Sequence, residues 1–548
     1  MPDLTESLQG RDLGHLRIIA EQWGIELDEQ DTSSALLHLK SLLIDSARVK
    51  EVVDGLPPDA KEALKDLARH AGRLPWAQFT RLYGEVREMG VAKRDREHPY
   101  KQPISAVEQL WYRGFLARAF FDSPAGPEEF AYIPDDLLAQ MPQVADAAVP
   151  LMGRQASVAE YAHVALVNDR VLDHACTLLA ALRMSISLPG PFPTPTGEEL
   201  TPSILTILLL ASGLLDEAGM PLPEPVRLFL EATRAEALVN LFRAWKLSDQ
   251  FNELLMLPDL STEGNWKNDP VRARQAILAY LNGIPTDTWW SLGSFIAAIK
   301  QRNPDFQRPA GDYDSWFIRN KRSGEYLRGY EHWEAVDGCL VRYILTGPLY
   351  WLGVLDLACP ESGQEVTAFR LSHWSRALLN DKHPKGMPME EESLVVRSDA
   401  RLSARRLLPR KARYQLARFC EWGKETPDEY QYQISPASLT QARKQGLTVS
   451  QLLVLINRYA KAAPPSLVKA LERWDKNGSE ARLEKMVILR VTSGEVLQAL
   501  RQSRASRFLG DPLGPTTIAI KPGATQKVLG VLAELGYLGE IRGDLEAD

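Results

Sequence analysis

A seven-residue pattern occurs twice in this chain, 239 residues apart, and it constrains the fold more than any other feature. Residues 110–116 read Leu-Trp-Tyr-Arg-Gly-Phe-Leu, and residues 349–355 read Leu-Tyr-Trp-Leu-Gly-Val-Leu. A helix that ends at a glycine in the left-handed conformation accounts for the shared leucine, aromatic pair and glycine. In both copies, apolar segments then flank a turn rich in Pro, Ser and Gly, at 123–127 and 360–363, which predicts a β-hairpin.

Helices followed by a two-stranded hairpin predict two winged-helix units, at 51–143 and 273–388. A wing that contacts DNA needs Lys and Arg, because phosphate neutralisation supplies most of the affinity. These hairpins carry carboxylates instead, namely Asp122, Glu128 and Glu129 in the first and Asp356, Glu361 and Glu365 in the second. We therefore favour units that contact protein or are purely structural over units that bind DNA.

The remaining segments complete a chain of several domains, as its 548 residues require. Residues 1–50 predict an N-terminal helical hairpin, which we interpret as a packing element rather than a DNA-binding module because its turn is acidic. Residues 144–272 predict a helical region. A solvated linker that ends in Glu390, Glu391 and Glu392 leads to a C-terminal domain at 389–548. The predicted fold class is a mainly α multidomain protein with winged-helix (α+β) units and a C-terminal α/β domain.

The charge of the chain is unevenly distributed. Residues 1–392 carry 39 Lys and Arg against 55 Asp and Glu, whereas residues 393–548 carry 25 against 16. This asymmetry places any attraction for a polyanion in the C-terminal third, unless two domains simply differ in isoelectric point.

Two basic runs in this third are candidates for phosphate contact. The segment 401–418 contains no acidic residue, and we expect its apolar residues to face a core while its cations face outward, either as a phosphate-contacting surface or as a solvated helix face. A second group of arginines has helical i, i+3 spacing. The nucleic-acid-binding candidates are Arg401, Arg405, Arg406, Arg410, Lys411, Arg413, Arg501, Arg504 and Arg507.

Aromatic residues alternate with cations at 316–330, a composition that suits single-stranded nucleic acid because bases stack on rings while phosphates meet the charges. The residues are Trp316, Phe317, Tyr326 and Tyr330 with Arg319, Lys321, Arg322 and Arg328. Nearby carboxylates dilute the charge, so we favour a core edge whose aromatic rings are buried beside a solvated basic loop.

Five ordered elements of the C-terminal third carry a family resemblance. They are Leu-Val-Val-Arg-Ser-Asp at 394–399, Ile-Ser-Pro-Ala-Ser-Leu at 434–439, Gly-Leu-Thr-Val-Ser-Gln-Leu-Leu at 446–453, the Pro-Pro to Trp segment at 464–474, and Pro-Gly-Ala to Leu-Gly-Tyr at 522–537. This region, about 393–541, resembles the N-terminal domain of XPB/Ssl2 DNA helicases. The family commonly has Gln-Pro-Asp where this chain has Arg-Ser-Asp at 397–399. The upstream half also resembles stand-alone bacterial helicase-associated proteins.

No helicase motor accompanies this resemblance in the sequence. A P-loop needs GxxxxGK[ST], and Gly423-Lys424 is followed by Glu425; a DExH box, HExxH and GxSxG are also missing. The four cysteines match no zinc spacing, and we expect them to be reduced, buried thiols. We therefore predict a protein that is not an enzyme and has no metal or cofactor; a catalytic site built from scattered residues is the least favoured hypothesis.

Two hypotheses about function remain. The first is a non-enzymatic, DNA-associated adaptor that binds DNA through its basic C-terminal domain and assists a helicase or another DNA-processing protein. The second is a protein-interaction scaffold that clasps an XPB-type helicase without touching DNA. The first residues lack the apolar core of a signal peptide, and the most apolar run, 204–215, is shorter than the ~20 residues of a membrane span, so we expect a cytoplasmic, nucleoid-associated protein without a membrane partner.

Overall fold

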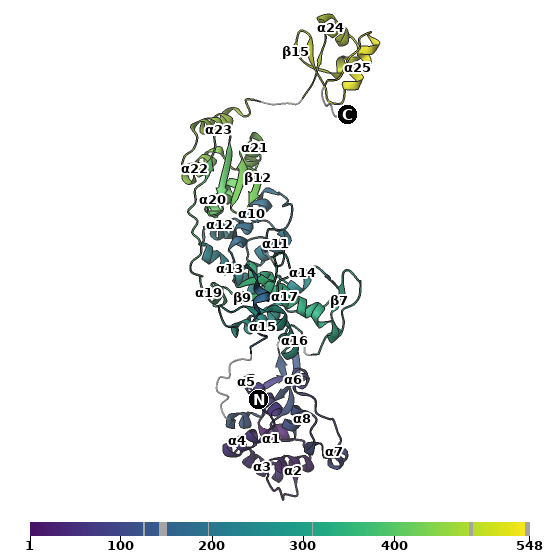
Figure 1. Cartoon of the computed structure of the whole chain (residues 1–548), viewed down its shortest axis with the longest axis vertical. Coiled ribbons are helices and arrows are strands. Elements are labelled where there is room, and N and C mark those ends of the chain that lie inside the picture. Colours follow the sequence, from purple (N-terminus) through teal and green to yellow (C-terminus); the bar gives the residue numbers. More distant parts are fainter. Residues whose placement is uncertain (124–125, 142–150, 196, 309–310, 482–485, 543–548) are drawn as a thin grey trace. The chain divides into compact units, whose positions relative to one another are not determined.

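The computed structural model describes residues 1–123, 126–141, 151–195, 197–308, 311–481 and 486–542. These residues form two compact units (Figure 1). The first comprises Met1–Val396, Ala400–Ile434 and Val454–Ala462, and the second comprises Arg397–Asp399, Ser435–Leu453 and Ala463–Asp548. The predicted boundary between residues 143 and 144 lies outside the described residues.

The N-terminal part of the first unit consists of short helices and a three-stranded antiparallel sheet of order β1-β3-β2. Its buried apolar residues, from Leu4 to Leu137, form one hydrophobic core, so residues on both sides of position 50 share it. Its elements are α1 (Leu4–Leu8), α2 (Leu13–Gln22), α3 (Thr32–Leu43), α4 (Ser46–Gly55), α5 (Pro58–Arg69), β1 (Arg73–Pro75), α6 (Trp76–Tyr83), α7 (Val91–Glu97), α8 (Ala106–Trp111), β2 (Ala117–Ser123), β3 (Gly126–Tyr132) and α9 (Asp135–Gln140).

Aspartates begin four of these helices. Asp3, Asp12, Asp31 and Asp45 are the N-cap residues of α1 to α4, and each side chain accepts a hydrogen bond from a backbone N–H of the first turn. Such a cap stabilises a helix by about 1 kcal/mol. Part of the acidic character of the N-terminus therefore serves local structure.

The central part of the first unit surrounds an antiparallel sheet of order β4-β8-β9-β6, and a separate ribbon pairs β5 with β7. Figure 1 shows β7 standing out from the helices of this part. The strands are β4 (His163–Ala165), β5 (Leu260–Glu263), β6 (Trp290–Ser291), β7 (Phe317–Asn320), β8 (Leu355–Cys359) and β9 (Ala368–Leu371). The helices are α10 (Arg170–Met184), α11 (Pro202–Ala211), α12 (Pro223–Glu231), α13 (Arg234–Leu247), α14 (Glu253–Met256), α15 (Pro270–Asn282), α16 (Leu292–Arg302), α17 (Cys339–Thr346), α18 (Pro348–Trp351) and α19 (Ser375–Leu379).

The repeated sequence pattern has the same backbone structure in both copies. Gly114 and Gly353 have φ of +73° and +82°, the left-handed conformation that ends a helix. The next residue donates a backbone hydrogen bond to the carbonyl five residues earlier, Phe115 to Leu110 at 3.1 Å and Val354 to Leu349 at 2.8 Å. The hairpins β2–β3 and β8–β9 follow, so both predicted hairpins are confirmed; Pro124 and Ala125 of the first turn lie outside the described residues.

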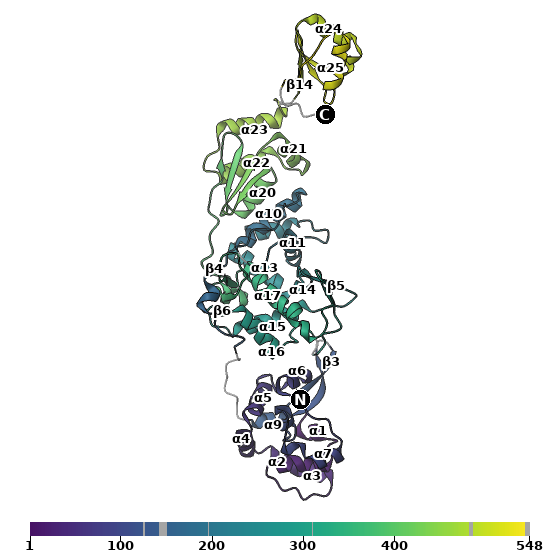
Figure 2. The ribbon, with the colours of Figure 1, turned by 45° about the vertical axis from the view of Figure 1, so that its right-hand side comes forward.

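The elements of the C-terminal third are divided between the two units. The first unit contains an antiparallel sheet of order β10-β11-β13-β12, and Figure 2 shows its helix α20 beside α10. The second contains a sheet of order β14-β16-β15 with a small core of its own. The elements are β10 (Val395–Val396), β11 (Arg401–Arg405), α20 (Arg410–Ala417), β12 (Glu421–Thr426), β13 (Glu429–Gln433), α21 (Pro436–Lys444), α22 (Val449–Tyr459), α23 (Pro465–Asn477), β14 (Val487–Arg490), α24 (Gly494–Gln502), β15 (Leu509–Gly514), β16 (Thr517–Ile520) and α25 (Thr525–Glu534).

Apolar periodicity in this third predicts helices at 449–459 and 464–475 and strands at 486–491 and 516–521, and α22, α23, β14 and β16 confirm them. The apolar sequence at 393–399 also predicts a buried strand, and this prediction is wrong: β10 is a two-residue edge strand in which Val395 is 47% exposed. The chain also has a strand that the sequence did not predict, β15. With it, the sheet β14-β16-β15 repeats the strand order of β1-β3-β2 and of β6-β9-β8.

Candidate nucleic-acid interface

A buried ion-pair network connects α10 and α13 with the segment that follows β11. Arg234 of α13 donates from Nε to Asp169 Oδ2 at 2.6 Å and from Nη2 to Asp173 Oδ2 at 2.8 Å. Arg406 reaches the same two carboxylates, at 2.7 and 3.0 Å. Burial alone raises the pKa of Asp173, but the charges of Arg234, Arg413 and Arg406 together hold that pKa below its ordinary value. At neutral pH the Asp173 carboxylate is therefore ionised.

Helix α20 contributes two more arginines to this interior. Arg410 donates from Nε to Glu390 Oε1 at 2.6 Å and from Nη2 to the carbonyl of Ala232 at 2.7 Å. Arg413 donates from Nη1 to Thr177 Oγ1 at 2.7 Å, and its guanidinium lies 4.0 Å from the centroid of the Tyr430 ring. Both side chains are fully buried. Their charges are used in contacts within the protein.

These contacts correct two predictions. Arg406, Arg410 and Arg413 do not face outward, because Asp169, Asp173, Glu390 and backbone carbonyls of the central part surround them. Glu390 is not part of a solvated linker, because it joins Arg410 and also Arg234, at 3.0 Å. Arg410 and Arg413 are buried, and Arg406 is ion-paired with 17% of its side chain exposed, so these three of the nine candidates have little free surface for a phosphate.

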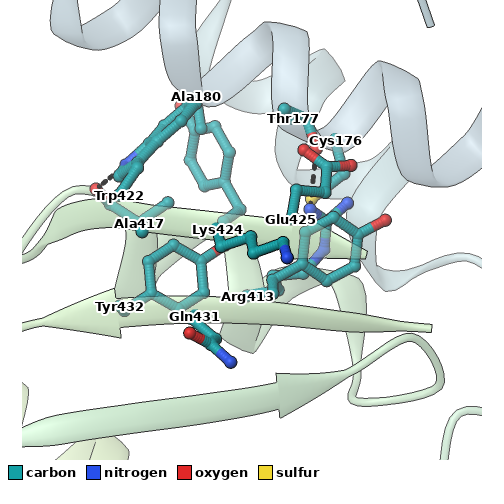
Figure 3. A pocket seen from close by; sticks show the side chains of 13 residues that line it. Cys176, Thr177, Ala180, Arg413, Ala417, Trp422, Lys424, Glu425, Gln431 and Tyr432 are labelled. Carbon is teal, nitrogen blue, oxygen red and sulfur yellow. Dashed lines mark hydrogen bonds between the residues drawn. The ribbon is translucent and has the colours of Figure 1, made fainter. Parts of the chain in front are cut away.

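A small cavity lies beside Arg413, between α10 and the β12–β13 hairpin (Figure 3). Its volume of about 30 Å³ is enough for water molecules but far below the ~300 Å³ of the smallest typical ligand sites. Among the residues that the structure describes, Nε of Arg413 has no hydrogen-bond partner, so it is the donor that a water molecule here would satisfy. Trp422 closes one side, with its indole N–H bonded to the carbonyl of Ala417 at 2.8 Å. The cavity is large enough for water and too small for a nucleotide.

Three candidates of the first basic run remain accessible. Arg401 and Arg405 are exposed on β11, and Lys411 is half-buried at the start of α20. Arg405 lies 3.8 Å from Glu392, and Lys411 lies 3.6 Å from Glu231. Ion pairs of this length at a surface contribute little stability, so both cations remain available to a phosphate.

The second basic run is exposed throughout. Arg501 lies at the end of α24, and Arg504 and Arg507 lie in the 3₁₀-helix Arg504–Phe508 that follows it. Arg504 bonds to Glu534, and the guanidinium of Arg507 lies 4.7 Å from the ring centroid of Phe508. The opposite side of α24 is anchored in the core by Val496, Leu497 and Leu500. Core packing therefore directs this run toward solvent.

The aromatic segment 316–330 combines features of both interpretations made from the sequence. Trp316 is buried, and its ring stacks on Trp266 with centroids 5.0 Å apart. Arg319 pairs with Glu263 at 3.3 Å, and Arg322 pairs with Asp259 at 3.1 Å, so partners from β5 and its flank neutralise part of the charge. The rings that remain partly exposed are those of Phe317, Tyr326 and Tyr330.

The structure also shows the environments of the hairpin carboxylate Asp356 and of the four cysteines. Asp356, one of the hairpin carboxylates, is buried and holds Arg370 at 2.7 Å, so its role is structural. Cys176, Cys359 and Cys420 are free and buried as predicted, whereas Cys339 is exposed. In the ranges that the structure describes, no group of three His, Cys, Asp or Glu side chains is arranged to hold a metal ion. No described helix has the length and apolar character needed to cross a membrane.

Comparison with known proteins relates the C-terminal third to helicases. The family model for the helicase conserved C-terminal domain matches residues 394–511. The match covers about a fifth of the chain and contains β11, α20 and the second basic run. No curated protein matches the chain.

Proposed function

We propose that this protein is a non-enzymatic, DNA-associated adaptor that binds nucleic acid through its C-terminal region and assists a helicase or another DNA-processing complex. The observation that carries the proposal is the helicase-domain match over residues 394–511, which contains exposed arginines of both basic runs. Within this proposal, the region is an XPB/Ssl2 N-terminal-like domain, and the units built on β1-β3-β2 and β6-β9-β8 are winged helices. We place the protein in the cytoplasm, at the nucleoid.

The exposed cations supply the physical basis for DNA binding. Arg501, Arg504 and Arg507 present three guanidinium groups from one short stretch of chain, and Arg401 and Arg405 present two from β11. Each phosphate that such a group neutralises releases counterions, so the affinity falls as salt is added. An arginine that contacts the phosphate backbone of DNA adds affinity without distinguishing one base sequence from another. This property suits a protein that accompanies a helicase along DNA.

The first test is fluorescence anisotropy of the full chain with labelled single-stranded, duplex and forked DNA at two salt concentrations. The proposal predicts binding that weakens steeply with salt. An isolated fragment at 389–548 is a poor reagent, because it lacks Ala232 at the end of α12 and Asp173 and Thr177 of α10, which accept hydrogen bonds from Arg410 and Arg413. Absence of binding to every DNA form at low salt contradicts the proposal.

A protein-interaction scaffold that clasps an XPB-type helicase is the second candidate function. Two observations favour it: three basic candidates make contacts in the interior network, and the first hairpin carries Glu128 and Glu129 on β3, the middle strand of its sheet. A pull-down from cells treated with nuclease separates the two functions. Retention of a helicase after nuclease treatment, together with no DNA binding by the purified chain, supports the scaffold.

A further inference from the structure

A cavity of about 590 Å³ lies in the N-terminal part, away from the residues that the proposed function uses. It is bounded by the start of α2, the segment 85–89, α7, the aromatic ends of α6 and α8, and the first residues of β2. Its volume lies within the ~300–1,000 Å³ that small-molecule sites commonly have. We call it the N-terminal pocket, and its charged walls are Arg11, Arg87, Arg94 and Arg118 with Asp12, Glu85 and Glu88.

Two of the four arginines are committed to the protein itself. Arg94 forms a bidentate pair with Asp12, both contacts at 2.7 Å, and this pair lowers the pKa of Asp12 to about 2. Arg87 forms a similar pair with the buried carboxylate of Glu108, at 2.7 Å. These two pairs hold the walls of the pocket in place. Because Arg94 and Arg87 are already neutralised by carboxylates, they offer little charge to a ligand.

Arg11 is different, because its guanidinium makes no hydrogen bond or ion pair with any residue that the structure describes. It is half-buried, and it lies 4.1 Å from the ring centroid of Trp111. Arg118, which lies over Trp76, has carboxylates only at 3.7 Å, beyond hydrogen-bond length. Burial, and then repulsion from Arg118, lowers the pKa of Arg11. Two like charges therefore face one cavity, and of the two only Arg118 has carboxylates at ion-pair distance among the described residues.

The remaining residues of the lining are uncharged, and several of them are aromatic. Trp76 and Trp111 meet edge to face, with ring centroids 6.0 Å apart, and the ring centroid of Tyr112 lies 5.6 Å from that of His15. Burial lowers the pKa of His15 to about 3, so its imidazole is neutral at physiological pH and offers one donor and one acceptor. A cavity that holds the unpaired guanidinium of Arg11, the long ion pairs of Arg118 and several aromatic rings suits an anion attached to a flat ring.

We propose that the N-terminal pocket binds a nucleotide, with the phosphate held by Arg11 and Arg118 and the base placed against Trp76, Trp111 and Tyr112. A guanidinium matches phosphate in a planar, two-pronged geometry, and indole and phenol rings stack with bases. Binding relieves the desolvated, unpartnered charge of Arg11. A free mononucleotide and the phosphorylated end of a strand offer the same chemistry. The site does not depend on DNA binding by the C-terminal region.

Calorimetric titration of the full chain tests this assignment, with the four ribonucleoside monophosphates, adenosine, ribose 5-phosphate, inorganic phosphate and a 5′-phosphorylated oligothymidylate as probes. At least one monophosphate binds more tightly than adenosine, ribose 5-phosphate or inorganic phosphate, because only a nucleotide uses both halves of the site. Competition by the phosphorylated oligonucleotide, and not by its unphosphorylated form, identifies a strand end. Binding of mononucleotides alone identifies a free nucleotide. Absence of binding by every phosphate probe overturns the proposal.

Variants then locate the binding. Arg11→Gln lowers the affinity for the nucleotide at least tenfold. Arg11→Lys lowers it by less, because lysine keeps the charge but loses the planar guanidinium that can donate two parallel hydrogen bonds and stack on Trp111. The matched control is Arg96→Gln on α7, which removes the same charge from a side chain 75% exposed outside the pocket. Unchanged melting temperatures exclude unfolding as the cause. Equal affinities of the Arg11→Gln variant and the wild type contradict the assignment.

Discussion

Two arginine runs of the C-terminal third have nearly the same spacing and opposite environments. Arg406, Arg410 and Arg413, the interior run, lie at intervals of four and three residues and are held by carboxylates and carbonyls of the central part. Arg501, Arg504 and Arg507, the surface run, lie at intervals of three residues and are exposed. The difference comes from what faces each run: α10 and α12 cover the first, while the second lies opposite the core of its own small domain.

This difference shows that a concentration of positive charge does not by itself identify a phosphate-binding surface. A buried arginine remains charged only where acceptors surround it. Asp169, Thr177 and Ala232 come from residues more than 150 positions away, whereas Glu390 lies 20 positions from Arg410. The interior run therefore joins the C-terminal sheet to the central helices. Among the described residues, the surface run has Glu534 and the Phe508 ring beside it, and it is the run available to a partner.

The largest expected difference between the runs is in stability. Arg410→Met removes the guanidinium that donates to Glu390 and to the carbonyl of Ala232, so that Glu390 keeps only Arg234 and a backbone N–H among the described donors. Loss of one partner of a buried pair costs about 3–5 kcal/mol. Arg501→Met, in the surface run, changes stability by less than about 0.5 kcal/mol. Urea unfolding of the two variants measures both values. Equal losses would show that the environments of the two runs are not distinct.

The second prediction concerns how the stability of this interior depends on pH, through His174, which follows Asp173 in α10. Burial lowers the pKa of His174 from 6.5 to about 4. The unfolded chain therefore binds a proton below pH 6.5 that the folded protein does not, so stability falls with falling pH, by about 2 kcal/mol at pH 5. His174→Phe keeps a ring against Phe192, 4.5 Å away, and removes the proton. Parallel pH–stability curves for wild type and variant would refute this origin.

We expect the surface run to contribute to DNA affinity but not to the stability of the fold. Replacing Arg501, Arg504 and Arg507 together by Gln removes up to three phosphate contacts, which lowers the salt slope of duplex binding by up to about 2.7. We expect at least a tenfold loss of affinity, or about 1.4 kcal/mol. Anisotropy at several salt concentrations measures both quantities. The control of equal charge replaces three exposed lysines outside the run, Lys444, Lys469 and Lys476, by Gln.

The smallest effect is expected at the accessible residues beside the interior run. Arg405→Gln with Lys411→Gln removes two cations whose carboxylate neighbours lie at 3.6–3.8 Å. The slope then falls by at most about 1.8, less than in the triple variant, and stability is unchanged. Anisotropy and urea unfolding of this variant are compared with those of the triple variant. A larger loss of affinity here would place the main DNA contact on β11 and α20.

Local signals in the sequence predicted much of the secondary structure. The repeated Leu-aromatic-aromatic pattern with glycine predicted two helix ends and the hairpins that follow, because the left-handed conformation is a property of the glycine itself. The bounds of α22 and of β16 follow from apolar periodicity. By contrast, β15 contains Gly510, Pro512 and Gly514, which read as a turn and form a strand only through pairing with β16.

The environments of the candidate residues depended on distant pairing, which the sequence does not display. Nothing near Arg413 indicates Thr177 or Asp173, and nothing near Glu390 indicates Arg234. The N-terminal pocket was missed for the same reason, because Arg11, Trp76, Trp111 and Arg118 come from four separate elements or loops. One signal was present: the first copy of the repeat places Trp111 at a helix end.

Hydrogen–deuterium exchange of the full chain, with and without single-stranded DNA, tests the contrast between the two runs most directly. The account predicts that backbone amides of α20 exchange slowly in the free protein and do not change when DNA is added, because the interior run is already buried. It predicts that amides of 501–509 become protected when DNA binds. Protection of α20 by DNA with no change at 501–509 would contradict it.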